Sequence, residues 1–126
     1  MLNVKALLTK ILSCVYTTGT DGAWSYRKYA DGTFEAWAAI TYNIAVQTTW
    51  GSLYISASRI QVDLPSFVNT TTGWSVICSA NGGELIRIVA KSSTSTPPFF
   101  TFTPVLATSR TAANRSLSVY VKGTWS

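Results

Sequence analysis

The sequence predicts an all-β domain, an antiparallel sandwich or barrel, and three observations lead to this expectation. Aromatic residues make up 13% of the 126-residue chain, and β-branched residues are plentiful; both kinds pack well on a half-buried sheet. Charged residues make up only 12%, about half the usual share, and serine and threonine take their place. Short strand-like runs are separated by turn signals about every ten residues, as in sandwiches and barrels.

The clearest predicted element is a hairpin over residues 24–40. Its turn is Asp31-Gly32, a pair that tolerates positive φ at both central positions of a two-residue loop. The register set by this loop pairs opposite charges once and aromatic rings twice: Lys28 with Glu35, Tyr26 with Trp37, and Tyr29 with Phe34. Each such pair stabilises a hairpin by about 0.2–1 kcal/mol. Because all three agree, we expect this register.

Further strands are expected at 53–60, 74–80, 84–90, 99–103 and 116–125. The turn Asn81-Gly82-Gly83 predicts that 74–80 and 84–90 form a second hairpin. Prolines at 97, 98 and 104 predict that 99–103 is an edge or an irregular strand. The last run alternates as a half-buried strand does, with Leu117, Val119 and Val121 on one face and Ser118, Tyr120 and Lys122 on the other.

Residues 2–15 differ from the rest because their apolar side chains recur at helical spacing, at Val4, Leu8, Ile11 and Val15. Such a short helix is marginal alone and must pack on something. Two interpretations stay open: a short helix on the domain's own core, or the last turns of a coiled-coil stalk. We therefore divide the chain into an N-terminal helix or stalk end at 1–18 and a β-sandwich head at 19–126. The stretch is too short for a membrane span, and no signal peptide is expected.

The net charge of +5 and the cysteine content exclude several classes of protein. The basic residues are scattered along the chain, whereas a nucleic-acid binder usually gathers them into a stripe. Two cysteines, Cys14 and Cys78, make neither a disulfide framework nor a metal site, so both are expected to be buried free thiols.

The sequence lacks the residues that catalysis usually requires. It has no histidine, the commonest general base and metal ligand. Asp21, Asp63 and Glu84 are the acids left for a glycosidase-type carboxylate pair, but Asp21 and Glu84 each lie beside a turn glycine, where a solvated or capping role is expected. No phosphate-binding loop or calcium loop is present. We expect a protein that is not an enzyme and that uses no cofactor or metal.

The segment 24–37, WSYRKYADGTFEAW, resembles a motif of phage and prophage tail proteins, W-x-Y-R-K-aromatic-x-D-G-x-x-E-x-W, which opens a small C-terminal β domain. The ending 120–125, YVKGTW, is similar to the strand, glycine and tryptophan with which those domains finish. Residues 63–67, DLPSF, are similar to an element before their central strand. The chain departs from the family pattern at Ala36, where cysteine is common, and at Asp63-Leu64, which replace an aromatic residue.

This resemblance implies the distal receptor-binding domain of a tail fibre: a jelly-roll-like sandwich, homotrimeric on a helical stalk, which binds a host surface saccharide noncovalently. It implies a virion protein that is made in the bacterial cytoplasm, with no nucleic-acid partner and no membrane insertion. Three alternatives stay open: a trimerisation or capping domain without a ligand, a solitary lectin-like module, and a polysaccharide depolymerase that would use Asp63 and Glu84.

Saccharide sites usually combine an aromatic ring with amide, carboxylate or guanidinium groups. The candidates outside the first hairpin are Trp50, Tyr54, Trp74, Asn81, Arg110 and Asn114. For each aromatic candidate, a place in the core or in a subunit interface is the competing interpretation. The loops expected at 43–51, 69–73 and 91–98 are where binding residues would gather on a rigid β scaffold.

Overall fold

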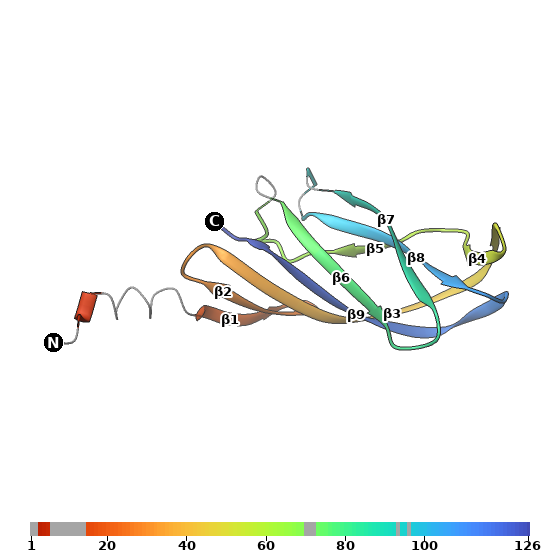
Figure 1. Cartoon of the computed structure of the whole chain (residues 1–126), viewed down its shortest axis with the longest axis horizontal. Helices are drawn as coiled ribbons and strands as arrows, with labels where there is room; N and C mark the ends of the chain where they lie inside the picture. The colour runs from red at the N-terminus through yellow and green to blue at the C-terminus, as the bar shows by residue number, and fades with distance from the viewer. Residues whose placement is uncertain (1–2, 6–14, 70–72, 93, 96) are drawn as a thin grey trace.

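One antiparallel sheet forms the fold in the computed structural model, which describes residues 3–5, 15–69, 73–92, 94–95 and 97–126 (Figure 1). The strands of this described part are β1 (Val15–Asp21), β2 (Trp24–Tyr29), β3 (Thr33–Trp50), β4 (Leu53–Ser56), β5 (Ile60–Asp63), β6 (Trp74–Ala80), β7 (Leu85–Ser92), β8 (Phe99–Leu106) and β9 (Arg110–Thr124). The expected all-β class is confirmed. Among the described residues, no helix is long and apolar enough to cross a membrane.

The predicted N-terminal helix is not seen. Most of it falls on residues 1–2 and 6–14, which lie outside the described part of the chain; of the described residues, only Val4 and Lys5 have helical geometry. Val15, the last member of the predicted stripe, begins β1. Gly22, at φ +60°, turns the chain so that Asp21 pairs with Trp24, and β1 is therefore the partner of β2. Glycine is required at the first position of this two-residue loop.

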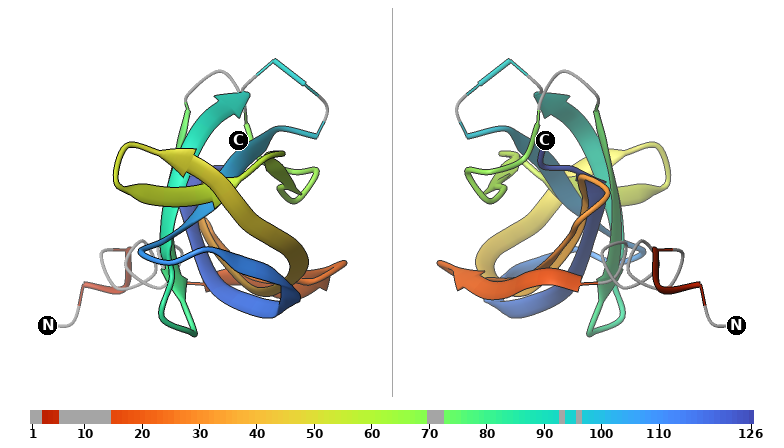
Figure 2. Two further views of the ribbon diagram at one scale, coloured as in Figure 1. Left: turned by 90° about the vertical axis from the view of Figure 1, so that its right-hand side faces the viewer. Right: turned by 90° about the vertical axis from the view of Figure 1, so that its left-hand side faces the viewer.

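β3 and β8 organise the sheet, because each of them pairs with other strands on both of its edges. β3 pairs with β9 along one edge, and with β2 and then β4 along the other. β8 pairs with β7 on one edge and with β5 and β4 on the other. Because β4 joins β3 to β8, the strands form a single curled sheet, visible end-on in Figure 2, and the residues that the structure describes do not form two separate sheets.

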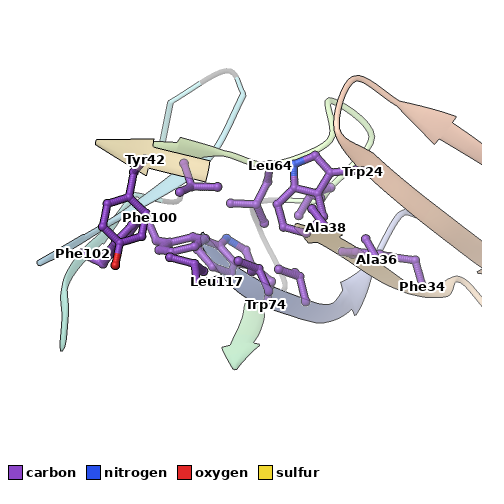
Figure 3. Close-up of a cluster of buried hydrophobic side chains, with 14 residues drawn as sticks. Trp24, Phe34, Ala36, Ala38, Tyr42, Leu64, Trp74, Phe100, Phe102 and Leu117 are labelled. Atoms are coloured by element: carbon purple, nitrogen blue, oxygen red, sulfur yellow. The ribbon is translucent and has the colours of Figure 1, made fainter. Parts of the chain in front are cut away.

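The core lies inside the curl (Figure 3) and takes side chains from both halves of the sheet. The ring of Phe102 on β8 meets that of Tyr42 on β3 edge to face, with centroids 5.3 Å apart. The predicted alternation along β9 is confirmed, since Leu117, Val119 and Val121 are all buried. This burial removes apolar surface from water, which is the main driving force for folding.

The first hairpin exists, but its predicted register is wrong by one residue. Arg27 faces Glu35, and Lys28 faces Phe34. Within the loop of this hairpin, only Gly32 has positive φ, at +92°, and its amide donates to the Tyr29 carbonyl. The loop therefore has three residues, a turn followed by a left-handed glycine, and not the two-residue loop with two positive φ values. A shift of one residue changes every facing pair.

The second predicted hairpin does not form. β6 pairs with β9, and β7 pairs with β8, so the chain at Asn81-Gly82-Gly83 crosses from one half of the sheet to the other. The predicted strand 53–60 is divided into β4 and β5. β8 is a central strand and not an edge, because β7 pairs with it on one side and β5 and β4 pair with it on the other. Pro104 lies opposite Ile86 of β7 and, on the other side, falls in the gap between the segments that pair with β5 and β4.

Candidate binding face

The pairing of β3 with β9 builds an exposed face on the side of the sheet away from the core. Alternate residues of these strands fill the core, so those between them point outward. The register aligns Trp37 with Tyr120 and Ile77, and Glu35 with Lys122 and Ser75. We call this surface the outer face; its members are Arg27, Tyr29, Glu35, Trp37, Ile77, Tyr120 and Lys122.

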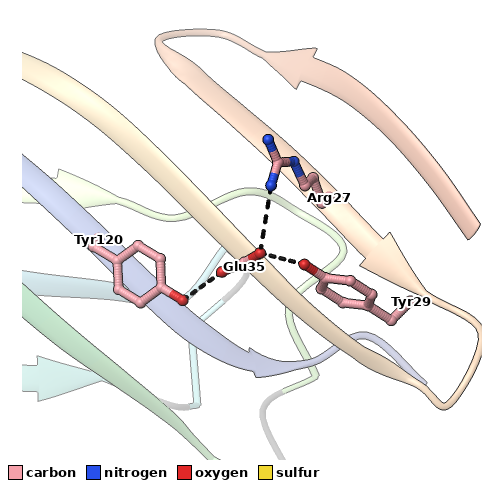
Figure 4. A network of polar contacts seen from close by, with 4 residues as sticks. All are labelled: Arg27, Tyr29, Glu35 and Tyr120. Carbon is pink, nitrogen blue, oxygen red and sulfur yellow. Dashed lines mark hydrogen bonds and ion pairs between the residues drawn. The ribbon is translucent and has the colours of Figure 1, made fainter. Parts of the chain in front are cut away.

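A network of polar contacts holds one carboxylate at the centre of the outer face (Figure 4). The Tyr120 hydroxyl donates to Glu35 Oε2 at 2.6 Å, and the Tyr29 hydroxyl donates to Glu35 Oε1. Arg27 Nη1 lies 3.9 Å from the same Oε1. The hydrogen bonds from Tyr120 and Tyr29 lower the pKa of Glu35 below its usual value. Glu35 is therefore a fixed negative charge at neutral pH.

The same contacts keep the two phenols protonated. The hydrogen bond to Glu35 raises the pKa of Tyr120 to about 12, and burial adds to this effect. The pKa of Tyr29 is also raised, first of all by its hydrogen bond to Glu35. Both hydroxyls donate their protons to the carboxylate, and the Tyr120 oxygen keeps lone pairs that can accept from a ligand.

An aromatic surface adjoins this charge. Trp37 is 38% exposed, and the Arg27 guanidinium lies 5.2 Å from its ring centroid. This cation–π contact holds the Arg27 side chain beside Glu35. Ile77, 67% exposed on β6, extends the apolar surface on the far side of Tyr120. A cavity of about 270 Å³ at the other end of the network is lined by Tyr29, Asp31, Thr33, Phe34, Glu35 and Lys122.

The residues predicted for binding lie mainly elsewhere. Trp50 is 44% exposed at the end of β3, where its ring stacks with Arg87 at 4.7 Å, and Tyr54 follows on β4. Trp74 is buried in the core beneath the Lys91 ammonium, in agreement with the competing interpretation given for the aromatic candidates. Arg110 is exposed at the start of β9.

Two predicted residues come together. Asn81 and Asn114 line one cavity of about 290 Å³ with Glu84. The predicted loop 43–51 is wrong, since this stretch continues β3 up to Trp50. Parts of the other two predicted loops, residues 70–72, 93 and 96, lie outside the described residues.

Sequence reasoning missed the outer face because it assigned Trp37 to the hairpin framework and paired Glu35 with Lys28. A usable signal was present. In Ala36-Trp37-Ala38 the small residues are buried and the large one points outward. The alternation of β9 had already put Tyr120 and Lys122 on the face opposite the core.

Asp63 and Glu84, the two acids that the depolymerase alternative would use, line different cavities. Asp21 and Asp63 line a cleft of about 420 Å³, while Glu84 lines the separate 290 Å³ cavity. Asp21 accepts from the Ser66 amide at 3.2 Å, and Asp63 accepts from the Gln61 side chain at 2.8 Å. Glu84 is buried, not solvated as its neighbouring glycine suggested. Within the described residues, no three acidic or cysteine side chains cluster to hold a metal.

The fold and this site define a class, an all-β domain that presents an exposed aromatic and charged face. A comparison of the chain with protein-family models, curated proteins and solved structures found no match.

Proposed function

We propose that this chain is the receptor-binding domain of a phage tail protein and that its outer face binds a bacterial surface saccharide noncovalently. The observation that carries the proposal is the exposed ring of Trp37, aligned with Tyr120 and next to the fixed carboxylate of Glu35. Trp37 and Glu35 belong to the segment that resembles the tail-protein motif, and Tyr120 begins the ending that also does.

The chemistry of the outer face suits a sugar. The Trp37 ring offers a rigid apolar surface on which the C–H face of a pyranose can stack. Glu35 can accept hydrogen bonds from sugar hydroxyls, while Arg27 and Lys122 can donate them. Because Tyr29 and Tyr120 already hold the Glu35 carboxylate, a ligand spends little free energy on ordering it.

In this proposal the domain acts as a homotrimer at the distal end of a tail fibre in the virion, with no cofactor and no nucleic-acid partner. The two halves of the curled sheet would be the layers of a jelly-roll-like sandwich. Light scattering on a sizing column tests the assembly. A mass near that of three chains supports the trimer, and the mass of one chain contradicts it.

Two tryptophan variants test the binding face. The purified domain is offered to a printed panel of bacterial surface polysaccharides and cell-wall fragments. Trp37→Ala should weaken binding to whichever glycan the wild type selects by about tenfold or more, as expected for a central aromatic contact. Trp50→Ala is the comparison, because Trp50 is 44% exposed at the other end of the same strand; if the outer face and not this predicted candidate binds the glycan, Trp50→Ala should bind as the wild type does. Full binding by Trp37→Ala, or no binding by the wild type, would contradict the proposal.

A second candidate is a trimerisation or capping domain that needs no ligand. Exposed apolar side chains on β6 and β7 favour it: Ile77 is 67% exposed and Leu85 is 70% exposed. If they lie between subunits, Ile77→Ser and Leu85→Ser should lower the mass in solution. This candidate also requires that Trp37→Ala leave host adsorption unchanged, so lost adsorption by a normally assembled variant would count against it.

A further inference from the structure

The cavity that Asn81 and Asn114 line lies beyond the end of β6, where residues 81–84 connect β6 to β7. It encloses about 290 Å³ and is lined by Asn81, Gly82, Glu84, Asn114, Arg115 and Ser116. This volume is near the lower limit of small-molecule sites. Asn114 and Tyr120 both belong to β9 and are about 20 Å apart along the strand. The cavity is therefore separate from the outer face but reached along the same strand.

Glu84 gives this cavity a buried charge with one uncommitted oxygen. The residue is only 7% exposed. Its Oε1 accepts from the hydroxyl of buried Tyr42 at 3.0 Å. No described residue donates a hydrogen bond to its Oε2. Glu84 lines the cavity and its Oε2 keeps its lone pairs, so this oxygen can accept a hydrogen bond from a donor that enters the cavity.

Gly82 keeps that oxygen accessible. A Cβ atom at position 82 would lie 2.6 Å from Glu84 Oε2, so any side chain there would displace the carboxylate. At Gly83 a Cβ atom would meet nothing within 4 Å. Neither glycine has the positive φ that would by itself require glycine. The absence of a side chain at position 82 therefore matters for the space in front of Glu84 and not for the backbone.

The other walls of the cavity supply donors. Asn114 Oδ1 accepts from Asn43 Nδ2 at 2.9 Å, which orients the Asn114 amide nitrogen as a donor. Arg115 Nη1 donates to the Ile44 carbonyl at 3.1 Å, and the guanidinium has further N–H groups. A hydroxyl group can donate to Glu84 and accept from Asn114 or Arg115. The cavity holds one acid and one base, so it presents no net charge that would select an anion or an ammonium group, whereas a neutral hydroxyl group can use both.

We propose that the Glu84 cavity is a second subsite, which binds the hydroxyl groups of a neutral sugar. The inference that the ligand is a saccharide rests on the proposed function. The cavity adds that the saccharide is a neutral one. A glycan that contacts both Trp37 and Glu84 must be an oligosaccharide, because the two lie at different points along the sheet.

The test uses the ¹⁵N-labelled full chain and three kinds of probe: neutral hexasaccharides (maltohexaose, cellohexaose, xylohexaose), hexagalacturonate and hexaglucosamine. A neutral hexasaccharide should shift the amide signals of residues 81–84 and 114–116. Gly82→Ala should weaken its binding about tenfold, the loss expected for one hydrogen bond to a charged group. Gly83→Ala should bind as the wild type does. Glu84→Gln, which keeps an acceptor for Tyr42, should also bind more weakly.

Three outcomes would overturn the subsite: wild-type affinity in both Gly82→Ala and Glu84→Gln, a response to the acidic or amino sugar alone, or no response to any probe. Unfolding midpoints of the variants near that of the wild type show that each has folded. Shifts at the cavity without shifts at Trp37 and Tyr120 would support the subsite and contradict the outer face. The reverse pattern would overturn the subsite and leave the outer face standing.

Discussion

The hydroxyl of Tyr120 on β9 donates a 2.6 Å hydrogen bond to Glu35 on β3, across 85 positions of the sequence. The bond exists because β9 pairs with β3 in a register that brings Trp37 opposite Tyr120. The charge, the phenol and the indole of the outer face are thus neighbours only in the folded sheet. Contacts within this network can be tested separately from ligand binding.

Replacing the carboxylate of Glu35 should make the free energy of unfolding depend less on pH. The pKa of Glu35 is lower in the folded protein than its ordinary value, so its stabilising effect is present above the unfolded pKa of about 4.3 and is lost as the pH falls through the folded pKa. Glu35→Gln should lower the free energy of unfolding by about 1 kcal/mol at neutral pH and by less near pH 3. Urea unfolding at both pH values measures this; a difference that does not change with pH would contradict it.

Lys28 should stabilise the fold through aromatic rings and not through Glu35. Its ammonium lies 4.4 Å from the ring centroid of Phe67 and 5.3 Å from that of Trp125. Lys28→Met should therefore cost about 1 kcal/mol of unfolding free energy, as expected for partly buried cation–π contacts. Lys122→Met, on the exposed outer face, should change it by less than about 0.5 kcal/mol. Chemical denaturation of both variants checks this, and equal effects would contradict it.

The loop of the first hairpin should not tolerate a side chain at position 32. Gly32 has φ +92°, its amide donates to Tyr29, and its carbonyl accepts from the Trp125 amide at 2.8 Å. Gly32→Ala should destabilise the protein by more than about 1 kcal/mol, because alanine resists this conformation. Gly83→Ala serves as the control, since Gly83 does not have positive φ and a Cβ atom there would meet nothing within 4 Å. Thermal unfolding of both variants makes the comparison, and similar midpoints would show that Gly32 is not required.

The thiol of Cys78 should react slowly in the folded protein. Cys78 is a free, half-buried thiol on β6, as predicted for its oxidation state, and burial raises its pKa to about 11. Because the thiolate is the reactive form, iodoacetamide near pH 8 should alkylate it much more slowly before unfolding than after. Cys14 lies outside the described residues, so the measurement uses a Cys14→Ser background. Equal rates in native and denaturing buffer would contradict the expectation.

The first hairpin shows where prediction from sequence succeeds and where it stops. The aromatic and charged residues on both sides of Asp31-Gly32 identified its two strands. Its register depended on whether one or two residues of the loop adopt positive φ, and Gly32 alone does so. Three attractive pairs in the predicted register were not decisive, because the real register offers Arg27 to Glu35 in place of Lys28.

The candidate sites were partly predictable. Asn81 and Asn114 were chosen from sequence and do line one cavity. Glu84 completes that cavity but was expected to be solvated, because a turn glycine precedes it. Its burial follows from the chain crossing between the two halves of the sheet, a consequence of strand pairing over long sequence distances.

By itself, the sequence determined the all-β class and which side of β9 is apolar, because alternation with a period of two is a local property of a strand. Only the tertiary structure decided that Trp74 is buried while Trp37 is exposed. Both tryptophans belong to strands that alternate, and local pattern cannot say which face of a sheet is covered. The curl of β5 and β8 over β3 and β9 covers one face and leaves the other for Trp37, Glu35 and Tyr120.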